Sequence, residues 1–152
     1  MISLMLAMIM VADASPTRLD LVCLGAGSAN KPDNQSVYAT DSYGNSAWGN
    51  VTGNRSVPFD DQVNLWVAEG DGRIRMPRVM LPLLRGGEDG WFKLKNIEVT
   101  ETAITASVAV NVINNPKMRV DRLTGLISLS GKAGNYTGEC QAYDPANTQR
   151  RF

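Results

Sequence analysis

The chain has 152 residues, and its 15 Lys and Arg balance its 15 Asp and Glu, so its formal net charge is zero. This length supports one domain with a core of its own, and the balanced charge argues against a nucleic-acid-binding protein. The chain has no His, which excludes Ser-His-Asp and Cys-His catalysis and His-ligated metal sites. Two Cys cannot form a four-thiolate zinc site, and we expect neither a metal nor a cofactor.

The N-terminal stretch MISLMLAMIMVADA is apolar and carries no charged side chain over residues 1–12. It is too short to span a bilayer, and Ala12 and Ala14 fit the small-x-small cleavage rule. We therefore predict a signal peptide over residues 1–14 and a periplasmic or secreted protein without a transmembrane segment. No Lys or Arg precedes the apolar run, so a buried N-terminal strand or helix is the alternative.

Cys23 and Cys140 lie near the two ends of the predicted mature chain. An even number of Cys in an oxidising compartment predicts a disulfide, and two buried free thiols are the alternative. Lipid attachment at Cys23 is disfavoured because Val22 stands where a lipidation signal needs a small residue.

The first half of the chain predicts a strand over residues 18–24 and another over residues 62–69, where apolar and polar side chains alternate. Residues 25–58 are rich in Gly, Ser, Asn and Asp and are predicted to be a long irregular loop with at most short strands. A tight turn at residues 70–72 leads to a returning strand. In residues 78–84, RVMLPLL, Pro82 favours an edge strand or a short helical turn.

The second half predicts a series of hairpins. The apolar pattern of residues 91–99 changes phase, which indicates a bulge near Asn96. A turn at residues 100–102 leads to a strand over residues 104–112, in which Ile104 to Val112 supply one apolar face at every second position. Further strands are predicted around residues 118–122, 126–130 and 136–143, with a turn at residues 123–125 in which Gly125 suits a positive φ.

These elements predict an all-β domain over residues 15–152, built as one antiparallel β-barrel or β-sandwich. A disulfide between Cys23 and Cys140 would make the N- and C-terminal strands neighbours. That arrangement favours a closed barrel of the lipocalin-like kind.

Short motifs at the two ends support a family resemblance. A Leu-Val-Cys strand follows the predicted signal peptide, and Val120-Asp121-Arg122-Leu123-Thr124-Gly125 and Gly138-Glu139-Cys140 precede a terminal Arg-Arg-Phe. The chain thereby resembles small, uncharacterised exported proteins of alphaproteobacteria. The resemblance covers about a third of the chain and implies a periplasmic β fold, without an activity to carry over.

Candidate binding residues are the aromatic side chains Trp66, Trp48 and Tyr43. Trp66 lies out of phase with the apolar residues of its predicted strand and therefore faces the opposite side, where an aromatic ring marks a binding surface. Partial cover of Trp66 by the 25–58 loop is the alternative. Asp121 and Arg122 form a candidate anion site, although a turn-capping role for Asp121 is favoured.

The sequence favours a non-enzymatic exported β domain that binds a small molecule, an envelope component or a protein. We expect an unknown ligand or envelope protein as partner, no nucleic acid, and a monomer or weak dimer. The first alternative is a carboxylate-dependent glycan hydrolase, and the second is an assembly or inhibitor protein that presents residues 78–84 as an edge strand. The hydrolase would use two carboxylates facing each other across a cleft, drawn from Asp60, Asp61, Glu69, Asp71, Glu88 and Asp89.

Overall fold

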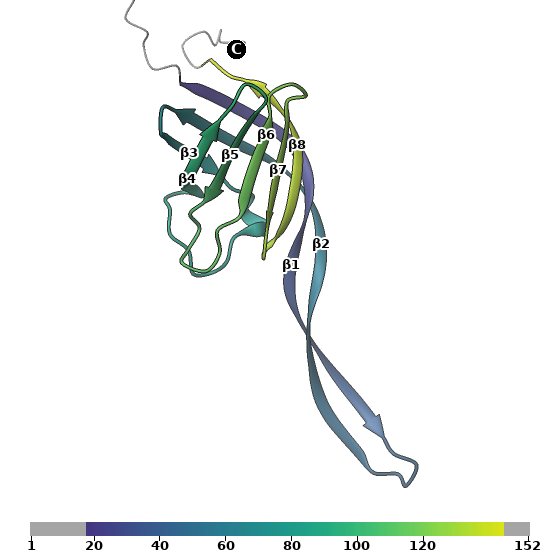
Figure 1. The fold of residues 1–152 in the computed structure, drawn as a ribbon. Helices are drawn as coiled ribbons and strands as arrows, with labels where there is room; N and C mark the ends of the chain where they lie inside the picture. Colours follow the sequence, from purple (N-terminus) through teal and green to yellow (C-terminus); the bar gives the residue numbers. More distant parts are fainter. Residues whose placement is uncertain (1–17, 145–152) are drawn as a thin grey trace, which may run out of the picture.

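The computed structural model describes residues 18–144 and shows eight antiparallel strands closed into a barrel (Figure 1). Each strand pairs with the next along the chain, and β8 pairs with β1. The strands are β1 (Leu19–Thr40), β2 (Ser46–Ala68), β3 (Asp71–Arg75), β4 (Trp91–Val99), β5 (Ala103–Val108), β6 (Lys117–Asp121), β7 (Leu126–Gly131) and β8 (Gly134–Ala142). The predicted all-β fold with adjacent terminal strands is confirmed, and closure of the ring decides for a barrel over a sandwich. The predicted signal peptide lies outside the described residues.

Alternating apolar side chains fill the interior of the barrel. Each of the eight strands contributes at least one side chain to a single hydrophobic cluster, as period-two alternation requires when one face of a sheet is buried. Among the largest buried side chains are Phe92, Leu65, Ile74, Ile104 and Tyr136. The interior is thus a packed core.

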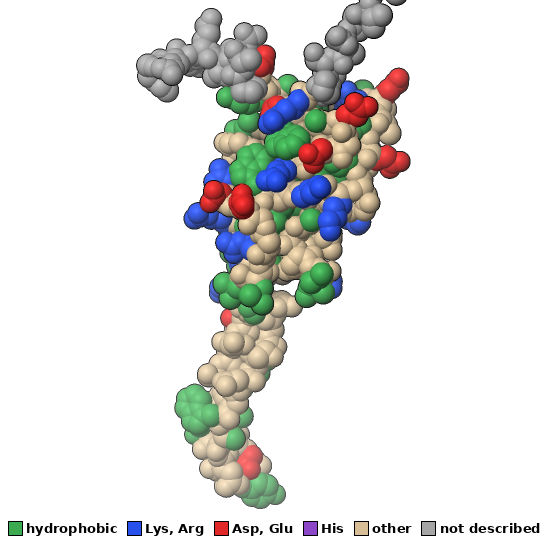
Figure 2. Space-filling view, turned by 90° about the vertical axis from the view of Figure 1, so that its left-hand side faces the viewer, with side chains coloured by type: hydrophobic (Ala, Val, Ile, Leu, Met, Phe, Trp, Pro, Cys, Tyr) green, Lys and Arg blue, Asp and Glu red, His purple; other side chains and the backbone are tan. Residues whose placement is uncertain are grey.

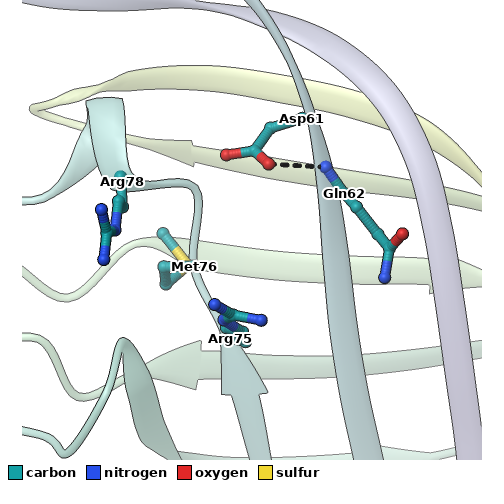
Figure 3. A pocket seen from close by; sticks show the side chains of 5 residues that line it. All are labelled: Asp61, Gln62, Arg75, Met76 and Arg78. Atoms are coloured by element: carbon teal, nitrogen blue, oxygen red, sulfur yellow. Dashed lines mark hydrogen bonds between the residues drawn. The ribbon is translucent and has the colours of Figure 1, made fainter.

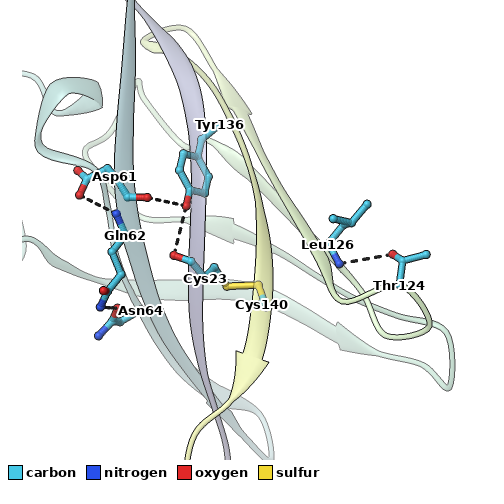
Figure 4. The surroundings of a disulfide bond; sticks show 8 residues. All are labelled: Cys23, Asp61, Gln62, Asn64, Thr124, Leu126, Tyr136 and Cys140. Carbon is cyan, nitrogen blue, oxygen red and sulfur yellow. Dashed lines mark hydrogen bonds between the residues drawn. A yellow bond between two sulfur atoms is a disulfide. The ribbon is translucent and has the colours of Figure 1, made fainter.

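The disulfide joins the two strands that close the ring (Figure 4). Cys23 of β1 lies directly opposite Cys140 of β8, and their Cα atoms are 3.9 Å apart. The predicted pairing is confirmed. A disulfide is the bond expected of a protein that works in an oxidising compartment.

Beside the disulfide, glycines let β8 approach β1 closely. A Cβ on Gly27 would collide with the Asn135 carbonyl oxygen and would lie 2.9 Å from the Phe59 ring. The rings of Phe59 and Tyr136, on the strands either side of Gly27, stack with centroids 6.2 Å apart. The Tyr136 hydroxyl donates a three-centre hydrogen bond to the carbonyl oxygens of Asp61 (2.9 Å) and Cys23 (3.3 Å), as Figure 4 shows.

Several predicted turns and strands are confirmed in detail. The register of β4 and β5 shifts between Lys95 and Glu98, and Asn96 adopts a φ of 52°, so the bulge lies where the change of phase predicted it. The β6–β7 turn is capped by Asp121, whose carboxylate accepts the backbone N–H groups of Leu123 (2.9 Å) and Thr124 (3.0 Å). These hydrogen bonds, Thr124 first, lower the pKa of Asp121, which supports the turn-capping role.

Other expectations were wrong. The strand predicted to end at Val112 ends at Val108, and Val112 is 98 % exposed in the following loop. RVMLPLL is not an edge strand, because Arg78–Met80 form the short 3₁₀ helix η1 and Met80 and Leu81 are buried. The alternative of a short helical turn for this segment is confirmed.

The largest error concerns residues 25–58, which are not an irregular loop. They complete β1 and begin β2, which pair without interruption from Leu19↔Val67 to Thr40↔Ser46. Beyond the barrel these strands continue as a two-stranded hairpin (Figure 1). Both faces of this hairpin meet solvent, so no buried face requires apolar residues at every second position. The sequence therefore lacks the alternation by which a strand is recognised.

Candidate functional site: the hairpin arm

The feature of the fold best placed to meet a partner is the part of the β1–β2 hairpin that projects from the barrel. β1 pairs with β8 only as far as Ala29, and β2 pairs with β3 only from Asn64. Residues 30–56, called the arm below, therefore form ladder pairs only with each other, and one further hydrogen bond runs from the Asn30 N–H to the Ala133 carbonyl oxygen. From the barrel to the turn the arm measures about 35 Å, at about 3.3 Å per residue.

One face of the arm carries no charged side chain. Side chains alternate between the two faces, and the register places the even-numbered residues of both strands on the same face. We call this the neutral face; its members are Asn30, Pro32, Asn34, Ser36, Tyr38, Thr40, Ser46, Trp48, Asn50, Thr52, Asn54 and Ser56. It offers amides, hydroxyls and one pair of aromatic rings.

The aromatic pair lies near the far end of the arm. Tyr38 and Trp48 are cross-strand partners with ring centroids 4.8 Å apart and planes tilted by 50°. Tyr38 is 56 % exposed and Trp48 is 77 % exposed. Figure 2 shows apolar side chains at the far end of an arm that is otherwise almost entirely polar and uncharged. Two adjacent large rings this exposed are unusual on a surface without a partner.

The turn at the far end is held by a carboxylate. Asp41 accepts hydrogen bonds from the backbone N–H groups of Tyr43 and Asn45, both at 2.9 Å, and from the Asn45 side-chain amide at 3.0 Å. Hydrogen bonds, those from Asn45 first, lower the pKa of Asp41. Gly44 supplies the positive φ of 86°. Tyr43 is left 89 % exposed at the end of the molecule.

The structure brings together two of the three predicted binding residues and separates the third. Trp48 and Tyr43 both lie in the outer part of the arm, whereas Trp66 lies in the barrel, about 60 Å further along β2 at strand spacing. Trp66 is half-buried, and the Arg18 guanidinium lies 4.5 Å from its ring centroid. Arg18 also forms an ion pair with Asp20 (2.8 Å). Trp66 therefore packs under a local cation–π contact, and the 25–58 segment does not cover it.

The carboxylates named for a hydrolase lie in three separate segments of the fold. Asp60 and Asp61 are consecutive in β2 and therefore point to opposite faces. Glu69 and Asp71 flank the β2–β3 turn at the other end of the barrel from the arm. Glu88 and Asp89 lie in the loop before β4.

A pocket of about 280 Å³ opens where β2 leaves the barrel (Figure 3). Asp61, Gln62, Arg75, Met76 and Arg78 line it, and the Asp61 carboxylate accepts the Gln62 backbone N–H at 2.8 Å. The pocket thus holds one acid and two guanidinium groups. It lacks the second carboxylate that glycoside hydrolysis requires.

At the root of the arm, two loops expose apolar side chains. Leu83 and Leu84 follow η1, and Val112 and Ile113 lie in the β5–β6 loop; all four are strongly exposed. The loops are tied together, because the Asn111 side-chain amide donates to the Leu84 carbonyl oxygen at 3.0 Å. Figure 2 shows apolar groups at this end of the barrel on both sides of the arm.

Within residues 18–144, no three or more Cys, Asp or Glu side chains lie close enough together to hold a metal ion. In the same part of the chain, no helix is long and apolar enough to cross a bilayer.

Tyr38, the second half of the aromatic pair, was not selected from the sequence as a site residue, and Val51, which is 55 % exposed in the middle of the arm, was not considered. Two prolines in the sequence could have indicated that the arm has open edges. Pro32 and Pro58 lie in segments in which a strand has an open edge, since proline cannot donate to a ladder.

Comparison with family models, with curated proteins and with solved structures found no match to this chain.

Proposed function

We propose that this chain is a non-enzymatic binding protein of the periplasm or cell exterior, and that it holds an uncharged, hydroxyl-rich polymer of the envelope, such as a neutral glycan, on the neutral face of its arm. The observation that carries the proposal is the Tyr38–Trp48 pair, which is exposed among amide and hydroxyl side chains on a face without charge.

The chemistry of the face fits such a ligand. Aromatic rings offer broad apolar surfaces, while Asn, Ser and Thr supply both donors and acceptors at short intervals. Because the face carries no charge, a neutral ligand that covers it buries no charged side chain, and binding incurs no desolvation penalty of that kind. The filled interior of the barrel, by contrast, favours an external binding surface over an enclosed small-molecule site.

Export is supported by the apolar N-terminal segment and by the disulfide, which oxidising compartments permit. The hydrolase alternative is less well supported, because the pocket at the root of the arm holds one carboxylate.

Co-sedimentation with insoluble polysaccharides tests the proposal. The purified chain is mixed with chitin and cellulose as neutral sugar polymers and with an acidic polysaccharide gel as comparison. We expect binding to at least one of the two neutral polymers, and little change between 0.05 and 0.5 M salt, because no charge pairing is involved.

Variants locate the site. A central aromatic side chain of an interface contributes about 2 kcal/mol, so Trp48→Ala is expected to weaken binding about thirtyfold. Trp66→Ala removes an aromatic ring from the barrel and serves as the matched control, with binding unchanged. Binding that survives Trp48→Ala, or binding to the acidic polymer alone, would contradict the proposal.

A further inference from the structure

The direction of the backbone hydrogen bonds shows which residues of the arm point their N–H and C=O groups outward. The Asp41 N–H donates to the Asn45 carbonyl oxygen at 2.8 Å, so these two residues form a hydrogen-bonded pair. Such pairs alternate along an antiparallel ladder with pairs whose N–H and C=O groups point outward. The even-numbered residues of both arm strands, those of the neutral face, are therefore the ones whose backbone groups point away from the hairpin.

Two independent observations agree with this assignment. The Asn30 N–H points outward and donates to the Ala133 carbonyl oxygen at 2.8 Å. Pro32 and Pro58 both occupy outward positions, where the missing N–H takes nothing from the β1–β2 ladder.

The two outer edges of the arm differ in what they offer. On β1, the Asn30 N–H is already used, and Pro32 has none, so the edge is blocked next to the barrel. On β2, six consecutive outward positions carry an N–H, and no proline interrupts them before Pro58. These positions are Ser46, Trp48, Asn50, Thr52, Asn54 and Ser56.

We propose that two copies of the chain pair through the outer edge of β2 and join their arms into one four-stranded antiparallel sheet. The register that uses all six positions has a two-fold axis at Val51. It places Ser46 of one copy opposite Ser56 of the other, and it forms about twelve backbone hydrogen bonds, since every outward position donates once and accepts once.

This register is self-complementary in charge and shape. Arg55 is the one charged side chain between Ser46 and Ser56, and it falls opposite Ala47 of the other copy. The two arginines lie about 26 Å apart at strand spacing, well beyond the screening length of about 8 Å at physiological salt. At the axis, the exposed Val51 side chain meets its own copy at a non-hydrogen-bonded position, where cross-strand side chains lie closest.

Pairing also adds to the stability of the arm. A lone two-stranded ribbon is marginally stable in water, and a second copy supplies partners for the backbone N–H and C=O groups on its outer edge. The even-numbered side chains of both copies fall on the same side of the joined sheet. The dimer therefore doubles the neutral face and shows two Tyr38–Trp48 pairs together, although the pairing itself does not depend on ligand binding.

Sedimentation equilibrium of the purified, oxidised chain tests the proposal through two proline variants. We expect a concentration-dependent dimer for the wild type. Thr52→Pro removes a central outward N–H from each copy, and it should raise the dimer Kd at least about thirtyfold. Asn34→Pro alters the cross-strand partner of Thr52 on the other edge, and it should leave the Kd unchanged.

A crosslinking experiment tests the register separately. Val51→Cys should form a covalent dimer under mild oxidation, because the two residues meet at the axis. Gly49→Cys, which would face Gly53 of the other copy, should not. A wild-type chain that stays monomeric at about 1 mM, a Thr52→Pro variant that still dimerises, or an Asn34→Pro variant that dissociates would overturn the proposal. Dimerisation that persists when glycan binding fails would separate this inference from the proposed function.

Discussion

Removal of the disulfide should lower the stability of the barrel by an amount that the fold allows to be calculated. Cys23 and Cys140 are separated by 117 residues, so the bond closes a loop that includes nearly the whole barrel. In the chain-entropy model, a loop of this size restricts the unfolded chain by an entropy that corresponds to about 5 kcal/mol at 25 °C. This value applies when the native barrel is the same with and without the bond.

Cys23→Ala combined with Cys140→Ala is the appropriate variant, because Cys23 is fully buried and a serine there would bury a hydroxyl. An ordered chain of about 130 residues has an unfolding entropy of about 270 cal/mol/K near its Tm, so 5 kcal/mol corresponds to a decrease of about 18 °C. Calorimetry of the oxidised wild type and the variant measures this difference. Wild-type protein unfolded in reductant is the control, and it should unfold near the variant.

A decrease of less than about 5 °C would contradict this expectation. It would mean that the two chain ends stay close in the unfolded state without the bond, so that the disulfide restricts little. A large loss accompanied by altered spectra of the folded variant would also contradict it, because the effect is assigned to the unfolded chain.

Five further results are expected. Tyr136→Phe should lower the free energy of unfolding by about 1 kcal/mol, because it removes the hydrogen bonds from the hydroxyl to the carbonyl oxygens of Asp61 and Cys23. Burial raises the pKa of Tyr136 to about 12, so its contribution is complete below the unfolded value near 10 and is lost as the pH rises towards 12; an alkaline absorbance titration should show one late phenol that the Phe variant lacks. Gly27→Ala should disrupt the β1–β8 contact and lower the Tm, whereas Gly53→Ala, in open space on the arm, should not. The pKa of Asp121 is lowered in the folded state, so the stability difference between wild type and Asp121→Asn should be full above about pH 4 and disappear as the pH falls further, which acid denaturation curves can check. Replacement of residues 32–54 by a short turn should change the barrel Tm by less than about 3 °C, because that segment contributes no buried side chain.

The barrel could be predicted from the sequence because burial leaves a pattern. Ile104, Ala106 and Val108 alternate with partners on the other face, and the change of phase at Asn96 marked the bulge. The disulfide followed from the number and placement of Cys23 and Cys140. Each of these signals arises from an interaction with the core.

The arm could not be predicted in the same way. The strands of the arm are regular and include Asn34, Ser36, Asn50 and Thr52. Because both faces of these strands meet solvent, their sequence lacks the alternation of apolar and polar residues from which a strand is predicted. The candidate site was therefore found in part. Trp48 was chosen as an aromatic residue, but its pairing with Tyr38 becomes apparent only when the register of the hairpin is known.

The order of strands around the barrel has a consequence for how the chain folds. Seven of the eight pairings join strands that follow each other directly in sequence, and each can form as a local hairpin. The eighth, between β1 and β8, joins residues more than 100 positions apart, as Cys23 and Cys140 illustrate. Contacts of such separation form late, because the loop-closure entropy must be overcome first. During synthesis, the sheet therefore stays open until β8 emerges, with β1 as an exposed edge that is prone to aggregation.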